Sequence, residues 1–175
     1  RPKSIGKVRS FIGQFGVLVR CWSYISACGP NGLRNVSEKA VLNANYAAAL
    51  LRDRFEMPFF DPAARQFCAH EFVTVPETLL GNGISLVDIA KRMIDFGIHP
   101  PTMHWPVHDC LMVEPTETES KQTLDHFASV MLRIADEIEQ SPESMPNAPL
   151  ESVIRRADEV SAARKPHTVH TNEAG

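Results

Sequence analysis

Hydrophobic periodicity predicts two long helices at the start of the chain. Over residues 4–28 apolar side chains recur at three- and four-residue steps, and from Phe11 onward they cover most of the circumference. A helix that is apolar on most sides needs packing partners on most sides, so we expect this segment to bridge two packed bodies. The turn signal Gly-Pro-Asn-Gly at 29–32 is expected to end it, and a second helix is expected over 35–54.

Four short segments have the composition of β-strands. A short strand is expected over 56–60, and a longer one, rich in Phe and Val and closed by Pro76, over 66–75. Two more strands are expected over 103–107 and 110–113. These segments are few and short, so they indicate a small sheet.

The clearest helix covers residues 85–96. Ser85 is a good N-cap residue, and Asp88 three positions later completes a capping box. Gly97 is placed to end the helix in a left-handed backbone conformation. The loop before this helix is marked by Gly-Asn-Gly at 81–83.

The C-terminal part of the chain is expected to be helical with proline-rich interruptions. A long amphipathic helix is predicted over 118–140, followed by a linker at 141–149 and a short charged helix at 151–163. The tail, 166–175, is expected to be mobile. The order of elements indicates an α+β fold, with a small sheet covered by helices.

Composition places the chain among ordinary globular domains. Its 175 residues suffice for one domain with a real core, and 43% are apolar and 22% charged. A net charge of −3 without a basic cluster argues against a nucleic-acid partner, and no segment is apolar enough to span a membrane. The four cysteines have no regular spacing, so we expect free thiols in a reducing, cytoplasmic compartment.

A group of histidines raises the possibility of a metal site. His99, His104 and His108 are spaced four and three apart, and Asp109 and Cys110 follow directly. Three prolines within residues 100–106 rule out the continuous helix that would align these side chains. On a strand, His104 and His108 share a face but lie too far apart for one ion unless the chain bends. We therefore expect histidines that are structural or line a site, and no metal.

His70 and Glu71 are neighbours within the expected strand 66–75. Strand alternation points the two side chains in opposite directions, so they do not form an acid/base pair by themselves. Burial of one of them with a hydrogen bond and a role in a site remain equally open.

The acidic run 114–119 has a mainly structural explanation. Thr116 and Glu119 match a capping box, and carboxylates at Glu117 and Glu119 suit the positive end of a helix. Glu114 stands before a proline at a strand end and is not explained in this way. The chain has no dinucleotide-binding glycine motif, phosphate-binding loop, nucleophile elbow or lysine in an apolar setting, so the residue pattern alone assigns no activity.

Several longer segments resemble a known enzyme family. These segments are RPKSIGKVRSFIGQFGVLVR, AVLNANYAAALL, AHEFV, DIAKRMIDFGIHPPTMHWPV and LMVEPTETESKQTLDHF. Through them the sequence is similar, over roughly residues 1–165, to glycine decarboxylase, the P-protein of the glycine cleavage system or decarboxylating glycine dehydrogenase. The opening helix and the ending VIRRADEVSAARKP are more similar to subunit 2 of the bacterial form that is split into two subunits.

The resemblance implies the C-terminal small domain of a fold-type-I pyridoxal-phosphate enzyme. Residues 1–28 would be an interdomain helix, 29–165 the small α+β domain and 166–175 a mobile tail. The family's Schiff-base lysine follows a histidine, and no His-Lys dipeptide occurs in this chain. Pyridoxal phosphate would therefore be bound mainly by a large domain upstream, and this chain alone would be inactive.

The family's reaction implies the substrate and the partners. Glycine is decarboxylated and its aminomethyl group passes to the lipoyl arm of H-protein, so glycine, lipoylated H-protein and subunit 1 are the expected partners. Two alternatives remain open: a non-catalytic interaction or dimerisation module derived from this fold, and a different fold-type-I decarboxylase.

The resemblance also suggests polar residues for the substrate cleft, but no catalytic and no metal-binding residue. His70 and Thr102 are the preferred cleft-facing groups, whereas Glu114 and Thr116 are also explained by a role in the strand–helix junction. Asn43 and Asn45 match the family too, although on a helix their amides can be satisfied locally. The substrate-binding candidates are His70, His99, Thr102, Glu114 and Thr116.

Overall fold

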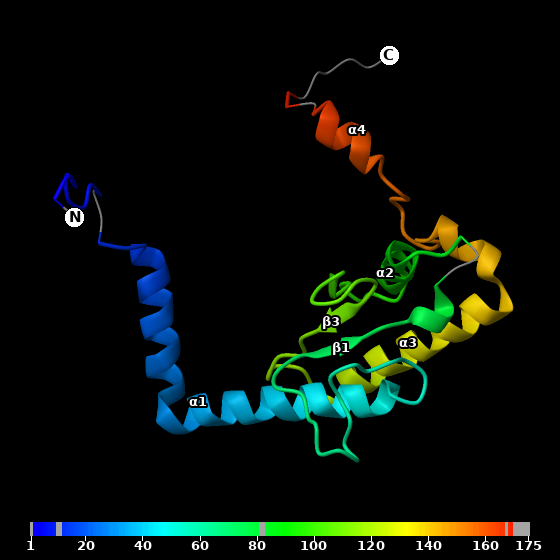
Figure 1. Ribbon diagram of the computed structural model, residues 1–175, viewed down its shortest axis with the longest axis horizontal. Helices are drawn as coiled ribbons and strands as arrows, with labels where there is room; N and C mark the ends of the chain where they lie inside the picture. Colours follow the sequence, from blue (N-terminus) through cyan, green and yellow to red (C-terminus); the bar gives the residue numbers. More distant parts are fainter. Residues whose placement is uncertain (1, 10–11, 81–82, 167, 170–175) are drawn as a thin grey trace.

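The computed structural model describes residues 2–9, 12–80, 83–166 and 168–169 and has the expected α+β fold (Figure 1). Three short strands form an antiparallel sheet in the order β1-β3-β2, with Val73 paired to Met112 and Met112 paired to Thr102. Helices pack around this sheet. The elements are α1 (Phe15–Leu51), β1 (Phe72–Thr74), η1 (Glu77–Leu79), α2 (Leu86–Asp95), β2 (Thr102–Met103), β3 (Leu111–Val113), α3 (Lys121–Gln140), η2 (Pro142–Asn147) and α4 (Glu159–Arg164).

α1 consists of two helical arms that meet at a sharp bend, so the two expected helices are present, but the turn between them is shorter than residues 29–32 (Figure 1). The bend lies at Gly29, whose φ of 61° and ψ of −179° are accessible to glycine and strained for other residues. Helical geometry resumes at Pro30, whose fixed φ suits the first position of a helix, and not at residue 35. Residues 4–9 are not helical, so the first helix begins at Phe15 and not at residue 4.

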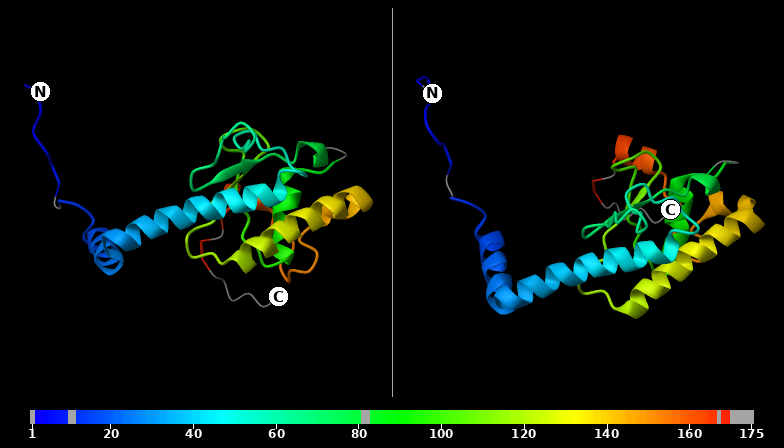
Figure 2. Two further views of the ribbon diagram at one scale, coloured as in Figure 1. Left: turned by 90° about the horizontal axis from the view of Figure 1, so that it is seen from below. Right: turned by 60° about the horizontal axis from the view of Figure 1, so that its bottom comes forward.

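The two arms of α1 have opposite surroundings (Figure 2). The second arm buries Ala44, Ala47 and Leu51 completely, whereas Phe15 and Trp22 on the first arm are 80% and 70% exposed. The figure shows the first arm extending away from the packed elements. The apolar circumference that the sequence predicts is therefore uncovered by the described residues, and its role as a bridge stays a prediction.

The hydrophobic core lies between the second arm of α1, the sheet, α2 and α3. Ala44, Ala47 and Ala48 of α1 belong to this core, and Figure 2 shows the second arm of α1 and α3 side by side. The largest fully buried side chains in the described chain include Phe72 on β1, Leu111 on β3, Ile89 and Met93 on α2, and Met131 and Ile134 on α3.

α2 confirms the predicted helix ends. Its capping box is present: the Asp88 carboxylate accepts hydrogen bonds from the backbone N–H of Ser85 at 2.7 Å and from its hydroxyl at 2.8 Å. At the other end Gly97 has a φ of 73°, and the N–H of Ile98 donates to the carbonyl of Met93 at 3.1 Å. This sharp stop directs the chain straight into residues 98–102.

The strands are shorter than the sequence predicts. Of residues 66–75 only β1 is a strand, and residues 56–60 contribute one isolated bridge, Glu56 to Val75. Residues 103–107 are mostly the turn between β2 and β3, because the backbone at His104 is left-handed with a φ of 60°. Residues 58–71 form irregular loops around the turn at Asp61, where Phe60 is buried but Phe59 and Phe67 are 44% and 61% exposed, so the apolar composition of this segment does not produce a strand.

α3 begins at Lys121, not at residue 118, so the capping box predicted at Thr116 and Glu119 is wrong. Ser120 is the N-cap, and its hydroxyl accepts a hydrogen bond from the N–H of Thr123 at 3.1 Å. Glu117 and Glu119 therefore precede the helix, and their carboxylates are free to serve other contacts.

The segment after α3 is packed and not a free linker. η2 lies within the predicted linker 141–149, and its Met145 is completely buried. The helix expected over 151–163 is limited to α4. Of the tail predicted to be mobile, residues 167 and 170–175 lie outside the described residues. The predicted domain boundary at residue 28 coincides with the bend at Gly29, and the division itself stays a prediction.

A polar network joins α2, α3 and the segment after η2. The Arg92 guanidinium pairs with both carboxylate oxygens of Glu137, at 2.7 and 3.1 Å, and with Asp95 at 2.9 Å. The side chain of Asp95 is fully buried and also accepts hydrogen bonds from the N–H groups of Leu150, at 2.6 Å, and Glu151, at 2.9 Å. This carboxylate therefore fixes the chain after η2 against α2.

Candidate functional site

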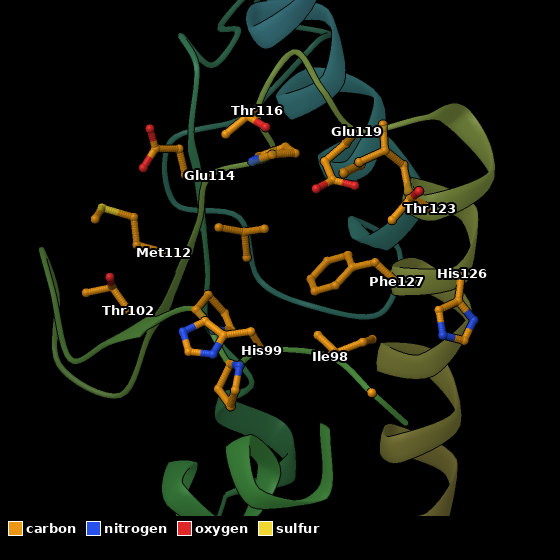
Figure 3. Close-up of a pocket in the computed structure, with 17 residues that line it drawn as sticks. Ile98, His99, Thr102, Met112, Glu114, Thr116, Glu119, Thr123, His126 and Phe127 are labelled. Carbon is orange, nitrogen blue, oxygen red and sulfur yellow. The ribbon is translucent and has the colours of Figure 1, made fainter. Parts of the chain in front are cut away.

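A concave pocket of about 500 Å³ opens where the loop after α2, the end of β3 and the start of α3 meet (Figure 3). Figure 3 shows Thr102, Met112 and Glu114 on one side, Glu119 and Phe127 on the other, and His99 below them. The lining residues are Ala47, residues 97–102, residues 112–116, Glu119, Thr123, Leu124, His126 and Phe127.

The pocket combines an apolar base with a polar, acidic rim. Ala47, Val113 and Leu124 are buried, whereas Glu114 and Glu119 are exposed. None of its lining residues is a lysine or an arginine. Such a pocket suits a small ligand or part of a larger one that carries hydrogen-bond donors or positive charge.

Four of the five predicted site residues, His99, Thr102, Glu114 and Thr116, line this pocket. His70, a preferred cleft residue, lies outside the lining, and its Nε2 is 3.8 Å from Oε1 of the lining residue Glu114. Substrate binding by all five remains a prediction.

The expected separation of His70 from Glu71 is wrong. Nε2 of His70 lies 3.9 Å from Oε2 of Glu71. β1 begins only at Phe72, so strand alternation does not apply to the two residues before it. Neither residue is buried: the side chains of His70 and Glu71 are 55% and 38% exposed.

Sequence reasoning missed the side of the pocket that comes from α3. Glu119, Thr123, His126 and Phe127 line it, and they all lie on or just before the first two turns of that helix. Glu119 was interpreted as a capping residue. The three-to-four-residue spacing of Thr123, His126 and Phe127 places them on one helix face, which is a signal that could have found them.

Asn43 holds the acidic segment in place, because its amide bonds to that segment and not within its own helix. Its Nδ2 donates to the carbonyl of Thr116 at 2.8 Å and to that of Glu119 at 3.4 Å. Asn45 does bond within its helix, to the carbonyl of Val41 at 2.7 Å, but it also exchanges two hydrogen bonds with the backbone of Cys68. Asn43 and Asn45 therefore each anchor a distant loop to α1.

Replacing Asn43 by alanine is expected to lower the free energy of unfolding by about 1–2 kcal/mol, because two backbone carbonyls lose their donor. Urea unfolding followed by circular dichroism measures this change. Ser37→Ala is the matched control, because the Ser37 hydroxyl bonds only within α1, to the carbonyl of Leu33. Equal stability of the two variants would contradict an anchoring role for Asn43.

A further contact joins the first arm of α1 to the same segment. The Tyr24 hydroxyl donates to Oε1 of Glu117 at 3.2 Å. Loss of water contact raises the pKa of Tyr24, and the charge of the Glu117 carboxylate raises this pKa further. The segment between β3 and α3 is therefore tied to both arms of α1.

Comparison with known proteins agrees with the resemblance. A family model described as the glycine dehydrogenase C-terminal domain matches residues 36–158. The chain belongs to this family. The match covers the second arm of α1 from Val36 onward and every later element before α4, so the pocket lies entirely within it.

Curated relatives extend the agreement to nearly the whole chain. A probable glycine dehydrogenase (decarboxylating) subunit 2 of Halalkalibacterium halodurans is 51% identical over 168 residues, which cover 95% of this chain and 33% of that protein. The protein of the same name from Shouchella clausii is 49% identical over the same coverage. The expected relation to the C-terminal portion of subunit 2 is confirmed, and the chain spans about a third of the length of these relatives.

One solved structure is similar in part. A crystal structure of glycine decarboxylase (P-protein) of the glycine cleavage system, in inhibitor-bound form, superposes on 64% of this chain and 24% of that chain. The TM-score is 0.49 and the sequence identity is 22%. Among the described residues, no helix has the length and apolar content needed to cross a membrane. The four cysteines are free.

Proposed function

We propose that this chain is the C-terminal part of a pyridoxal-phosphate-dependent glycine dehydrogenase, the P-protein of a glycine cleavage system. The single observation that supports this most is the family match over residues 36–158, which includes the whole pocket. The complete protein decarboxylates glycine and passes the aminomethyl group to the lipoyl arm of H-protein. It acts in the cytoplasm with subunit 1 as its other half.

The pocket alone does not fit the cofactor. Cations favour a phosphate group and carboxylates oppose it, and a pyridoxal aldehyde needs a lysine. The lining has neither lysine nor arginine, and it presents the carboxylates of Glu114 and Glu119. Pyridoxal phosphate is therefore held by other parts of the complete protein, and the pocket of this chain lines one side of the cofactor site.

The pocket residues have roles other than covalent bonding to the cofactor. Carboxylates at Glu114 and Glu119 favour positive charge nearby, and His99 and Thr102 offer hydrogen bonds to a small polar ligand. The apolar base from Ala47, Val113 and Leu124 excludes water from one side of such a ligand. These side chains therefore bind and orient, and none of them is assigned a proton transfer.

The exposed first arm of α1 fits the same proposal. Its large apolar side chains, with Trp22 at 70% and Leu18 at 58% exposure, are too many for a free surface helix. In the complete protein they pack against the part that holds the cofactor, as the predicted interdomain helix would.

The absorbance of pyridoxal phosphate tests which part of the protein binds the cofactor. With added pyridoxal phosphate, we expect the purified chain to develop no internal-aldimine absorbance band and the full-length protein to develop one. A full-length protein that binds no cofactor would overturn the enzyme assignment and leave the interaction module. Such a band from the isolated chain would overturn the interpretation that its pocket lines the cofactor site without binding the cofactor.

A further inference from the structure

The hairpin between β2 and β3 carries a polar cluster separate from the pocket. Nδ1 of His104 lies 3.4 Å from Oδ1 of Asp109, and Nδ1 of His108 lies 2.8 Å from its Oδ2. One potential ligand atom from each of these three residues lies within 4.8 Å of the others. Within the residues that the structure describes, no second group of this kind occurs.

The backbone of the hairpin brings the three side chains together. His104 and Asp109 both have left-handed backbone conformations, with φ of 60° and 54°. The N–H of His104 donates to the carbonyl of Cys110 at 2.9 Å, and the buried Cys110 thiol donates to the carbonyl of Trp105 at 3.0 Å. On a straight strand His104 and His108 would lie too far apart to share an ion, but the chain bends between them.

We propose that His104, His108 and Asp109 form a binding site for a divalent transition metal ion, with Zn²⁺ as the best match. Two imidazoles and a carboxylate are ligands that Zn²⁺ accepts, and three protein ligands leave a fourth position for water. The site binds the ion only after the histidines are neutral, so metal binding displaces protons.

The distances suit this ion after small side-chain movements. Bonds of about 2.0–2.2 Å in tetrahedral geometry place neighbouring ligand atoms about 3.3 Å apart. The two histidine–aspartate distances of 3.4 and 2.8 Å lie on either side of that value. The ligand nitrogens of His104 and His108 lie within 4.8 Å of each other. Rotation of His108 can bring them closer, because its side chain is 86% exposed.

A bound ion would stiffen the hairpin that supports one side of the pocket. β2 and β3 place Thr102 and Met112 in the lining, and the cluster lies on the connection between these strands. The proposal does not depend on the proposed function, because the ligands come only from this hairpin and lie outside the pocket lining.

Zinc titration against a chromophoric chelator tests the site. His167 and His170 lie outside the described residues, so the reference protein carries His167→Gln and His170→Gln to remove their competition. We expect one Zn²⁺ per chain in this reference, and at least a tenfold weaker affinity after Asp109→Asn, His104→Asn or His108→Gln. Asparagine is chosen at the two left-handed positions because it tolerates that conformation.

His126→Gln is the matched control, because it removes a histidine outside the cluster, and we expect it to leave the zinc affinity unchanged. Circular dichroism confirms that each variant is folded, and titration with Co²⁺ gives an independent absorbance signal from the bound ion. No zinc bound by the reference protein, or equal affinities in Asp109→Asn and His126→Gln, would overturn the proposal.

Discussion

Replacing Asp95 by alanine is expected to lower the free energy of unfolding by about 3 kcal/mol. The fully buried carboxylate pairs with Arg92 and accepts three backbone hydrogen bonds, from residues 150–152. Breaking a buried pair by removal of one partner costs about 3–5 kcal/mol, and the lower value applies here because Arg92 keeps its bidentate contact with Glu137. Urea unfolding at neutral pH measures the loss.

Asp53→Ala is the matched control, because the Asp53 side chain is 92% exposed and its loss should change stability by less than about 0.5 kcal/mol. A destabilisation of Asp95→Ala no larger than that of Asp53→Ala would contradict the anchoring role of this carboxylate.

The same network predicts how stability depends on pH. Burial by itself raises the pKa of Asp95, but the hydrogen bonds from Leu150, Arg92, Glu151 and Ser152 outweigh it and hold the pKa below its usual range. A carboxylate whose pKa is lower in the folded state contributes stability above its unfolded pKa, and this stability is lost as the pH falls through the folded pKa. Asp95→Asn should therefore flatten the loss of stability below about pH 4, the ordinary pKa of aspartate.

Replacing His99 by alanine in the full-length protein is expected to reduce kcat/KM for glycine on the order of 10- to 100-fold, the value of one lost hydrogen bond to a charged group. His99 lines the pocket and is exposed, and within the described part of the chain its side chain takes part in no hydrogen bond or ion pair whose loss would weaken the fold. Steady-state kinetics at several glycine concentrations measure the effect.

Thermal unfolding should show that His99→Ala is as stable as the parent protein. Gln122→Ala is the matched control, since Gln122 is exposed beside the pocket residue Thr123 but is not part of the lining. Unchanged kcat/KM in His99→Ala would remove this residue from the substrate site.

Local sequence signals predicted those elements whose ends are set locally. α2 follows from Ser85, Asp88 and Gly97, because capping and left-handed termination depend on neighbouring residues only. The bend in α1 lies at Gly29 for the same reason. The family resemblance suggested five site residues, and four of them line the pocket.

Other features depend on contacts between distant segments and could not be read from local patterns. Asn43 on α1 bonds the carbonyls of Thr116 and Glu119, which lie more than 70 positions away along the chain. The side of the pocket from α3 was missed because its polar residues also suit an exposed helix face. The close approach of His104 and His108 depends on backbone conformations that their sequence does not specify.

The most direct test of the proposed function is exchange of labelled bicarbonate into the carboxyl group of glycine by the full-length protein with subunit 1 and lipoylated H-protein. We expect exchange that depends on the residues of this chain, is specific for glycine and falls after His99→Ala. Exchange into another amino acid at a comparable rate would indicate a different decarboxylase. No exchange at all, with pyridoxal phosphate bound, would contradict the assignment of this chain to a glycine-cleaving enzyme.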